Sequence, residues 1–128
     1  MGARYTVSTE IGFSASHSLS HHEGDCRRLH GHNWIVRVSY EFERLDDAGL
    51  TVDFLVLRRQ LEAAILPRFD HRHLNDMPPF EGVDPTSERI AAEIYRVLNE
   101  EAVFDRGRLV EVELWETPVD MVRYREEG

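Results

Sequence analysis

The sequence predicts an α+β protein in which two pairs of strands flank two helices. Residues 5–17 and 32–42 alternate apolar and polar side chains with a period of two, as half-buried strands do. Residues 54–69 and 87–98 repeat apolar side chains every three or four positions, which is typical of helices that bury one face. The order β-β-α-α-β-β with short links indicates an antiparallel sheet with both helices packed on one face.

The ends of these elements are marked by particular residues. We expect Asp53 to cap the first helix and Thr86 or Ser87 to cap the second, because short polar side chains accept hydrogen bonds from the free N–H groups of a first turn. Pro67 should end or bend the last turn of the first helix. Two further strands are expected, over residues 110–114 and 119–125. Without a linker or repeat, residues 1–128 should form a single domain.

Composition excludes several classes of protein. The net charge is −9, which argues against nucleic acid as a partner because phosphate backbones are bound mainly by clustered basic side chains. All 15 residues in the Lys and Arg count are arginine, so neither a Schiff-base lysine nor a P-loop lysine is available. No apolar run has the length of a membrane span and the first ten residues do not resemble a signal peptide, so we expect no membrane association and a soluble, cytoplasmic protein.

Three histidines give the strongest chemical signal. His30 and His32 are two residues apart at the start of a strand, so both side chains leave the same face of the sheet. His17 ends the apolar face of the first strand and lies beside that pair if the two strands are neighbours. Three neutral imidazoles without a fourth protein ligand are typical of an open catalytic zinc site. Two alternatives stay open: separately packed histidines, or a closed structural site with Cys26 as the fourth ligand.

Candidate acids and bases lie elsewhere in the chain. A cation near Cys26 would lower the pKa of its thiol and make it a base. Asp70 can orient the adjacent His71 for proton transfer, although the same pair also occurs in ordinary turns. Glu116 continues an apolar stripe that starts at Val110, and a buried carboxylate needs a partner. That partner is either an arginine or a ligand with paired N–H donors, such as a pterin or guanine ring.

Six segments of the chain match a known family in order. They are FSASHSL at 13–19, CRRLHGHNW at 26–34, VDF at 52–54, DH at 70–71 with LN at 74–75, PTSE at 85–88 and WET at 115–117. The chain thereby resembles the 6-carboxytetrahydropterin synthase and 6-pyruvoyltetrahydropterin synthase family over nearly its whole length.

The resemblance implies roles for the candidate residues. His17, His30 and His32 would hold Zn²⁺, Cys26 would be the proton-abstracting base with Asp70 and His71 as its relay, and Glu116 with Thr86 would bind the pterin. It also implies the tunnelling fold, or T-fold, in which sheets of several subunits close into a barrel. Such proteins are commonly homohexamers whose active sites are shared between neighbours.

The spacing of the thiol favours one branch of the family. Three residues separate Cys26 from His30, which is similar to bacterial carboxy-forming enzymes. These convert dihydroneopterin triphosphate to carboxytetrahydropterin with loss of acetaldehyde and triphosphate, an early step towards 7-deazapurines such as queuosine. Arg27 and Arg89 depart from the usual motifs. A pyruvoyl-forming sister enzyme and a non-catalytic pterin- or zinc-binding protein remain as alternatives.

Overall fold

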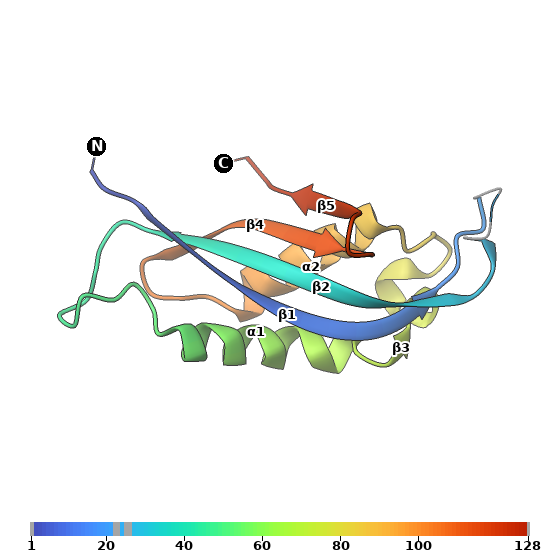
Figure 1. Cartoon of the computed structure of the whole chain (residues 1–128), viewed down its shortest axis with the longest axis horizontal. Helices are drawn as coiled ribbons and strands as arrows, with labels where there is room; N and C mark the ends of the chain where they lie inside the picture. The colour runs from blue at the N-terminus through green and yellow to red at the C-terminus, as the bar shows by residue number, and fades with distance from the viewer. Residues whose placement is uncertain (1, 22–23, 25–26, 128) are drawn as a thin grey trace.

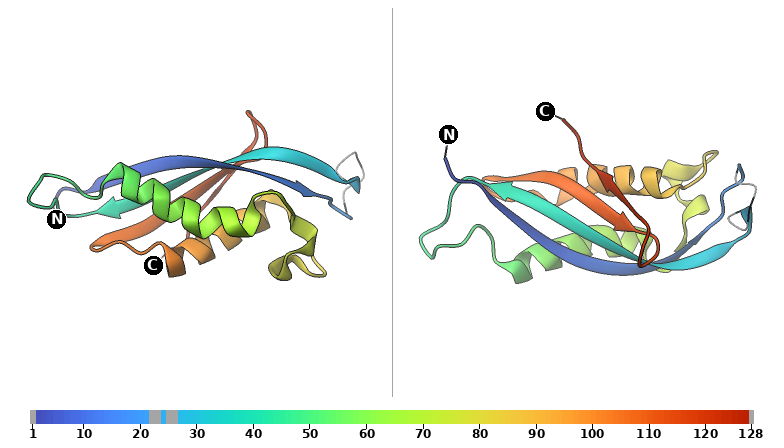
Figure 2. Two further views of the ribbon diagram at one scale, coloured as in Figure 1. Left: turned by 90° about the horizontal axis from the view of Figure 1, so that it is seen from below. Right: turned by 45° about the horizontal axis from the view of Figure 1, so that its top comes forward.

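One sheet forms one layer of the molecule and two helices form the other (Figure 1). The computed structural model describes residues 2–21, 24 and 27–127. The sheet order is β3-β1-β2-β4-β5, with β1 at Tyr5–His17, β2 at His30–Phe42, β3 at Arg72–His73, β4 at Gly107–Trp115 and β5 at Met121–Tyr124. The helices are α1 at Phe54–Phe69 and α2 at Ser87–Glu101, with short 3₁₀ turns η2 at Leu74–Asp76 and η3 at Pro78–Phe80 between them. Both helices cross the same face of the sheet, as Figure 2 shows from below, so the predicted α+β class is confirmed.

The long hairpin of β1 and β2 decides which side chains enter the core. The two strands pair antiparallel along their whole length, from Tyr5 opposite Phe42 to His17 opposite His30. Alternate residues therefore face the helices, and Trp34, which is fully buried, belongs to that row. The histidines predicted as ligands lie at the end of the same row. The cluster of these three histidines is therefore an extension of the core.

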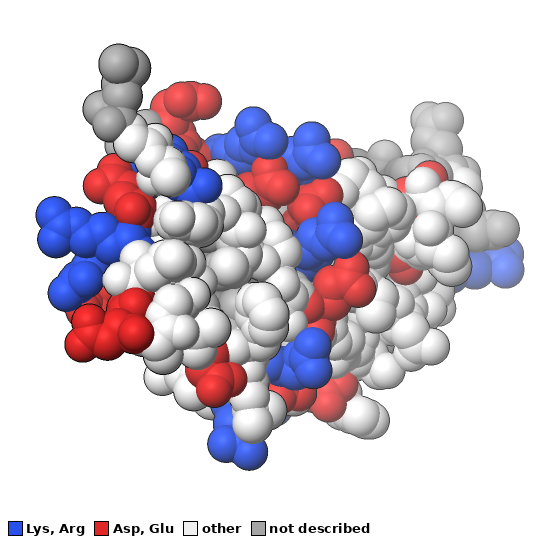
Figure 3. All heavy atoms as spheres, turned by 60° about the vertical axis from the view of Figure 1, so that its left-hand side comes forward, with Lys and Arg blue, Asp and Glu red and all other residues white. Residues whose placement is uncertain are grey.

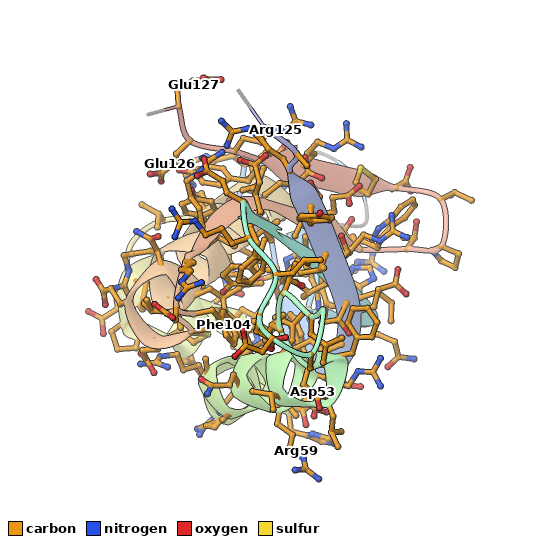
Figure 4. The ribbon with its side chains drawn as sticks, turned by 90° about the vertical axis from the view of Figure 1, so that its left-hand side faces the viewer. Asp53, Arg59, Phe104, Arg125, Glu126 and Glu127 are labelled. Carbon is orange, nitrogen blue, oxygen red and sulfur yellow. The ribbon has the colours of Figure 1, made fainter. Side chains whose placement is uncertain are left out.

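Both helices begin and pack as the sequence predicts. Asp53 accepts a hydrogen bond from Leu55 N–H at 2.7 Å and lies at the start of α1, as Figure 4 shows. Thr86 Oγ1 accepts from Arg89 N–H at 3.2 Å at the start of α2. The fully buried apolar residues of the two helices include Leu57, Leu61, Ile65 and Phe69 in α1, and Ile90, Ala91, Ile94, Val97 and Leu98 in α2.

Two details differ from the sequence prediction, whereas Pro67 does lie in the last turn of α1, where Asp70 N–H still bonds Leu66 O and the helix ends at Phe69. The first difference is a fifth strand, β3, which pairs parallel to β1, so the sheet is mixed. Its two residues are too few to show alternation in the sequence. A register shift between β2 and β4 at Ser39 and Tyr40 leaves Val110 only partly buried.

The sheet face away from the helices is polar. Arg125 Nε donates to Glu111 at 2.6 Å, and Arg123 Nη2 donates to Glu113 at 3.3 Å, which leaves both glutamates buried beneath arginine side chains. On the face of the molecule seen in Figure 3, acidic and basic side chains lie close together. Within the described part of the chain, no helix has both the length and the apolar character needed to cross a membrane.

Candidate metal centre

Three imidazoles meet at one end of the sheet, on the face that carries the helices. His17 is the last residue of β1 and lies opposite His30, the first residue of β2, while His32 lies opposite Ala15. Side chains at alternate positions share a face, so all three rings point to the same place. One ring nitrogen of each lies within 4.8 Å of those of the other two. The structure thus brings together the three residues predicted as ligands.

Backbone carbonyls fix the tautomer and orientation of two of these rings in their neutral form. His17 Nδ1 lies 2.9 Å from Pro85 O, and His30 Nδ1 lies 2.7 Å from Arg28 O. A carbonyl oxygen only accepts hydrogen bonds, so Nδ1 carries the proton and Nε2 keeps its lone pair in a neutral ring. Histidines that bind metals are commonly oriented in this way.

Two of the remaining ring nitrogens have no partner. His17 Nε2 and His32 Nε2 are buried and make no hydrogen bond with any described residue. Burial lowers the pKa of both rings below 6.5, in spite of the nearby carboxylate of Glu116. Both rings are therefore neutral at pH 7, and a buried lone pair without a donor is unfavourable. A divalent metal ion satisfies such lone pairs, and three imidazoles suit Zn²⁺.

Glu116 follows β4 and reaches the same cluster. Its Oε1 lies 3.4 Å from His17 Nε2 and 3.8 Å from His32 Nε2. Ser87, the first residue of α2, donates from its hydroxyl to the same oxygen at 3.1 Å. None of the ion pairs among the described residues joins Glu116 to an arginine. The carboxylate is half-buried and faces the three-histidine cluster, with Oε2 free of any hydrogen bond to the described residues.

Asp70 and His71 form a dyad away from the three histidines. His71 Nδ1 donates to Asp70 Oδ2 at 3.0 Å, and Ser14 N–H donates to Asp70 Oδ1 at 2.9 Å. The Ser14 amide, followed by His71, lowers the pKa of the Asp70 carboxyl. The left-handed backbone of His71, with φ at 57°, projects its ring outward, and 82% of the side chain is exposed.

The dyad borders a hollow on the polar side of the sheet. This hollow has a volume of about 490 Å³ and is lined by His71 together with Ser14, Ser16 and Asn33, and also by His32. The side chains of Ser14, Ser16 and Asn33 alternate with those of the three-histidine cluster, so they leave the opposite face. Among the described residues, the recorded hydrogen bonds and ion pairs of His71 include none to the three-histidine cluster.

The remaining candidate site residues are Thr86 and Cys26, and the structure adds Trp34. Thr86 lies one residue from Ser87 and caps α2, so it borders the cluster through the helix start. Cys26 lies outside the described residues. Trp34 was missed as a site residue: the rings of His17 and His32 each pack edge-on against it, with centroids 5.2 Å away. Its place two residues after His32 in the same row was the available signal.

Fold and site together define a T-fold protein with a three-histidine centre. The solved 6-pyruvoyl tetrahydropterin synthase of Caenorhabditis elegans superposes with a TM-score of 0.82 at 26% identity, covering 98% of both chains. The Plasmodium falciparum structure of that name superposes with a TM-score of 0.75 at 18% identity. The sequence model of the 6-pyruvoyl tetrahydropterin synthase family matches residues 6–127, and the chain belongs to this family.

Similar sequences carry two names. The chain is 40% identical over 124 residues to the 6-carboxy-5,6,7,8-tetrahydropterin synthase of Synechocystis, covering 94% of this chain and 92% of the relative. It is 32% identical to the protein of the same name in Bacillus subtilis, covering 94% and 85%. The human 6-pyruvoyl tetrahydrobiopterin synthase is 34% identical, covering 94% and 91%. These relatives are tetrahydropterin synthases, enzymes of the lyase type.

Proposed function

We propose that this protein is a zinc-dependent 6-carboxytetrahydropterin synthase. It converts 7,8-dihydroneopterin triphosphate to 6-carboxy-5,6,7,8-tetrahydropterin and releases acetaldehyde and triphosphate, an early step towards 7-deazapurines such as queuosine in the cytoplasm. The observation behind the proposal is a cluster of three imidazoles, two of them with buried unpartnered nitrogens, next to the carboxylate of Glu116. The 40% identity to the Synechocystis relative supports the carboxy product.

His17, His30 and His32 would hold the zinc ion. When bound, the ion supplies a Lewis acid that polarises side-chain oxygens of the substrate and favours loss of the neighbouring carbon-bound protons. Burial lowers the pKa of the His17 and His32 rings and so favours their neutral forms, while carbonyl partners fix the orientation of His17 and His30. Trp34 packs against two of the rings and excludes water from that side.

Glu116 is suited to recognise the pterin ring. A pterin presents an amide N–H and an amino N–H side by side, and a carboxylate accepts both in a bidentate arrangement. The Ser87 hydroxyl holds Oε1 at 3.1 Å and leaves further lone pairs free for the ligand. Thr86, one residue earlier, would add a hydroxyl at the edge of the ring. Anchoring the ring here would place the substrate side chain at the histidines.

Proton transfer would fall to Cys26, Asp70 and His71. Asp70 accepts the Nδ1 proton of His71, so the exposed Nε2 is free to take or deliver a proton. Because His71 borders the polar side of its own sheet, we propose that it serves the metal centre of a second copy in a homo-oligomer, a hexamer by resemblance. Cys26 would be the base that first removes a proton from carbon.

A pyruvoyl-forming enzyme is the second candidate, since the human pyruvoyl relative is 34% identical, slightly more than the Bacillus subtilis carboxy relative at 32%. The test is incubation of the zinc-loaded protein with dihydroneopterin triphosphate, with products identified by mass spectrometry. A Cys26→Ala variant runs beside it, with Ser8→Ala on the polar sheet face as control.

The products separate the candidates. Acetaldehyde and carboxytetrahydropterin from wild type and the control, strongly reduced in Cys26→Ala, would support the proposal. A pyruvoyl product would assign the sister reaction. Pterin and zinc binding without turnover would favour a binding protein.

A further inference from the structure

Every second residue from Ser14 to Ser20 is a serine, and each of these serines forms a hydrogen bond with the segment between α1 and α2. Ser14 N–H donates to Asp70 Oδ1 at 2.9 Å, the Ser16 hydroxyl bonds His73 Nδ1 at 3.0 Å, Ser18 N–H donates to Asn75 Oδ1 at 2.9 Å, and the Ser20 hydroxyl donates to Asp84 Oδ1 at 2.8 Å. Residues 70–84 therefore follow residues 14–20 in the same direction. His17 lies in the middle of this series, and Asp84 is its last member.

Asp84 is the most enclosed carboxylate of the series. Only 9% of the residue is exposed, and both of its oxygens are occupied: Oδ1 by the Ser20 hydroxyl and Oδ2 by His21 N–H at 3.1 Å. These two donors lower the pKa of its carboxyl, with the Ser20 hydroxyl the larger cause. Its own carbonyl accepts from Arg89 Nη1 and from Thr86 N–H, each at 2.9 Å. Asp84 thus joins the segment after His17 to the start of α2.

The residue after Asp84 orients a metal-facing ring. Pro85 O accepts the hydrogen bond of His17 Nδ1 at 2.9 Å and so fixes which nitrogen of the buried ring faces the cluster. Asp84 is therefore linked to the histidine cluster in two ways. Its side chain bonds Ser20 and His21, which follow His17 in the chain, and the next residue, Pro85, supplies the carbonyl that accepts from the His17 ring. Among the described residues, the hydrogen bonds of Asp84 go to Ser20, His21, Thr86 and Arg89 and to none of the three histidines.

We propose that Asp84 is a positioning residue for the metal centre, which holds the His17 ring and the segment that leaves it in the geometry that binds the ion. This role rests on the zinc site proposed above. It predicts that loss of the carboxylate weakens metal binding and makes residues 18–21 less ordered, in addition to any effect on folding. Outer hydrogen-bond partners of metal-binding histidines commonly change metal affinity by about 10–100-fold when removed.

The first experiment measures zinc affinity of the metal-free protein by competition with a chromophoric chelator. Asp84→Ala should weaken zinc binding by about 10-fold or more. Asp84→Asn should stay within about threefold of wild type, because the amide oxygen accepts from His21 N–H while the Ser20 hydroxyl turns to accept from the amide NH₂. Asp105→Ala is the matched control, since 94% of that side chain is exposed.

The second readout is hydrogen–deuterium exchange of residues 18–21, which should be faster in Asp84→Ala and unchanged in Asp105→Ala. Should Asp84→Ala fail to fold, Ser20→Ala replaces it and should weaken zinc binding by about fivefold, the equivalent of one hydrogen bond. Zinc affinity equal to wild type in folded Asp84→Ala or Ser20→Ala would overturn the proposal. A wild type that binds zinc but makes no pterin product leaves this test intact, whereas a wild type that binds no zinc overturns the metal site and the role of Asp84 with it.

Discussion

The metal-free protein should lose stability as the pH falls below 6.5. His17 is fully buried and His32 is partly buried, and burial lowers the pKa of both rings in the folded state. In the unfolded chain each ring regains the ordinary value of 6.5. Between the lowered pKa and 6.5 the unfolded state binds more protons than the folded state. The free energy of unfolding therefore decreases as the pH is lowered through that window, and these two rings leave it unchanged above the window.

The size of the effect follows from the number of rings. One imidazole that stays neutral when folded changes the free energy of unfolding by up to about 1.4 kcal/mol per pH unit. His17 should approach this limit because it has no exposed surface, while the His32 side chain, at 19% exposed, should contribute less. The sum, between about 1.4 and 2.7 kcal/mol per unit, is a large share of the roughly 5–15 kcal/mol typical of a domain. Asp70, whose pKa is lowered from 3.8, acts only at more acidic pH.

Urea unfolding at pH 7.5, 6.5 and 5.5, at one protein concentration and with a chelator present, measures this slope. His17→Gln should reduce it to the smaller contribution of His32, because glutamine keeps a donor for Pro85 O but does not titrate. His21→Gln, at an exposed position, is the control and should keep the slope. Saturating zinc should raise stability at pH 7.5, by about 4 kcal/mol at a thousandfold excess over Kd. Constant stability between pH 7.5 and 5.5, or an unchanged slope in His17→Gln, would refute the account of two neutral buried imidazoles.

Three further outcomes are expected. Glu116→Gln should lower kcat/KM about 100-fold without loss of zinc, because the amide presents a donor to the pterin N–H groups; Glu10→Gln serves as control, and an unaltered kcat/KM would contradict the anchoring role. Asp70→Asn should reduce kcat about 10- to 100-fold and shift its pH profile, since His71 loses the carboxylate that holds its tautomer; an unmoved profile would argue for a purely structural turn. Tyr40→Phe removes a buried hydrogen bond of 2.7 Å, so urea unfolding should show a free energy of unfolding lower by about 1 kcal/mol while kcat stays at the wild-type value. A loss of activity at equal stability would contradict a purely structural role for Tyr40.

Local patterns in the sequence were sufficient for most of the fold. Period-two alternation located β1 and β2, and helical spacing located the buried faces of α1 and α2, because these periods depend only on backbone geometry. The caps Asp53 and Thr86 were likewise local, since each bonds an amide within three residues. The two-residue strand β3 was beyond this reasoning because its pairing depends on β1, far away in the chain.

The register shift illustrates the same limit within a predicted strand. Alternation alone placed Val110 in the core, but the irregularity opposite Ser39 and Tyr40 moves Leu109 into the buried row instead. An added residue in one strand reverses which side chains face inward on one side of it. Nothing in the sequence of β4 itself distinguishes the two arrangements.

The sequence by itself determined that His30 and His32 share one face, because residues two apart in a strand point the same way whatever surrounds them. Only the tertiary structure decided that His17 joins them, through the pairing of β1 with β2, and what surrounds that face. The Pro85 carbonyl lies 68 residues from His17, and Ser87 lies 29 residues from Glu116, so the contacts that orient a ring and a carboxylate exist only once α2 packs against the sheet. The shared face of His30 and His32 is thus a local property of one strand, whereas the third histidine and the orientation of the side chains depend on packing between segments distant in sequence.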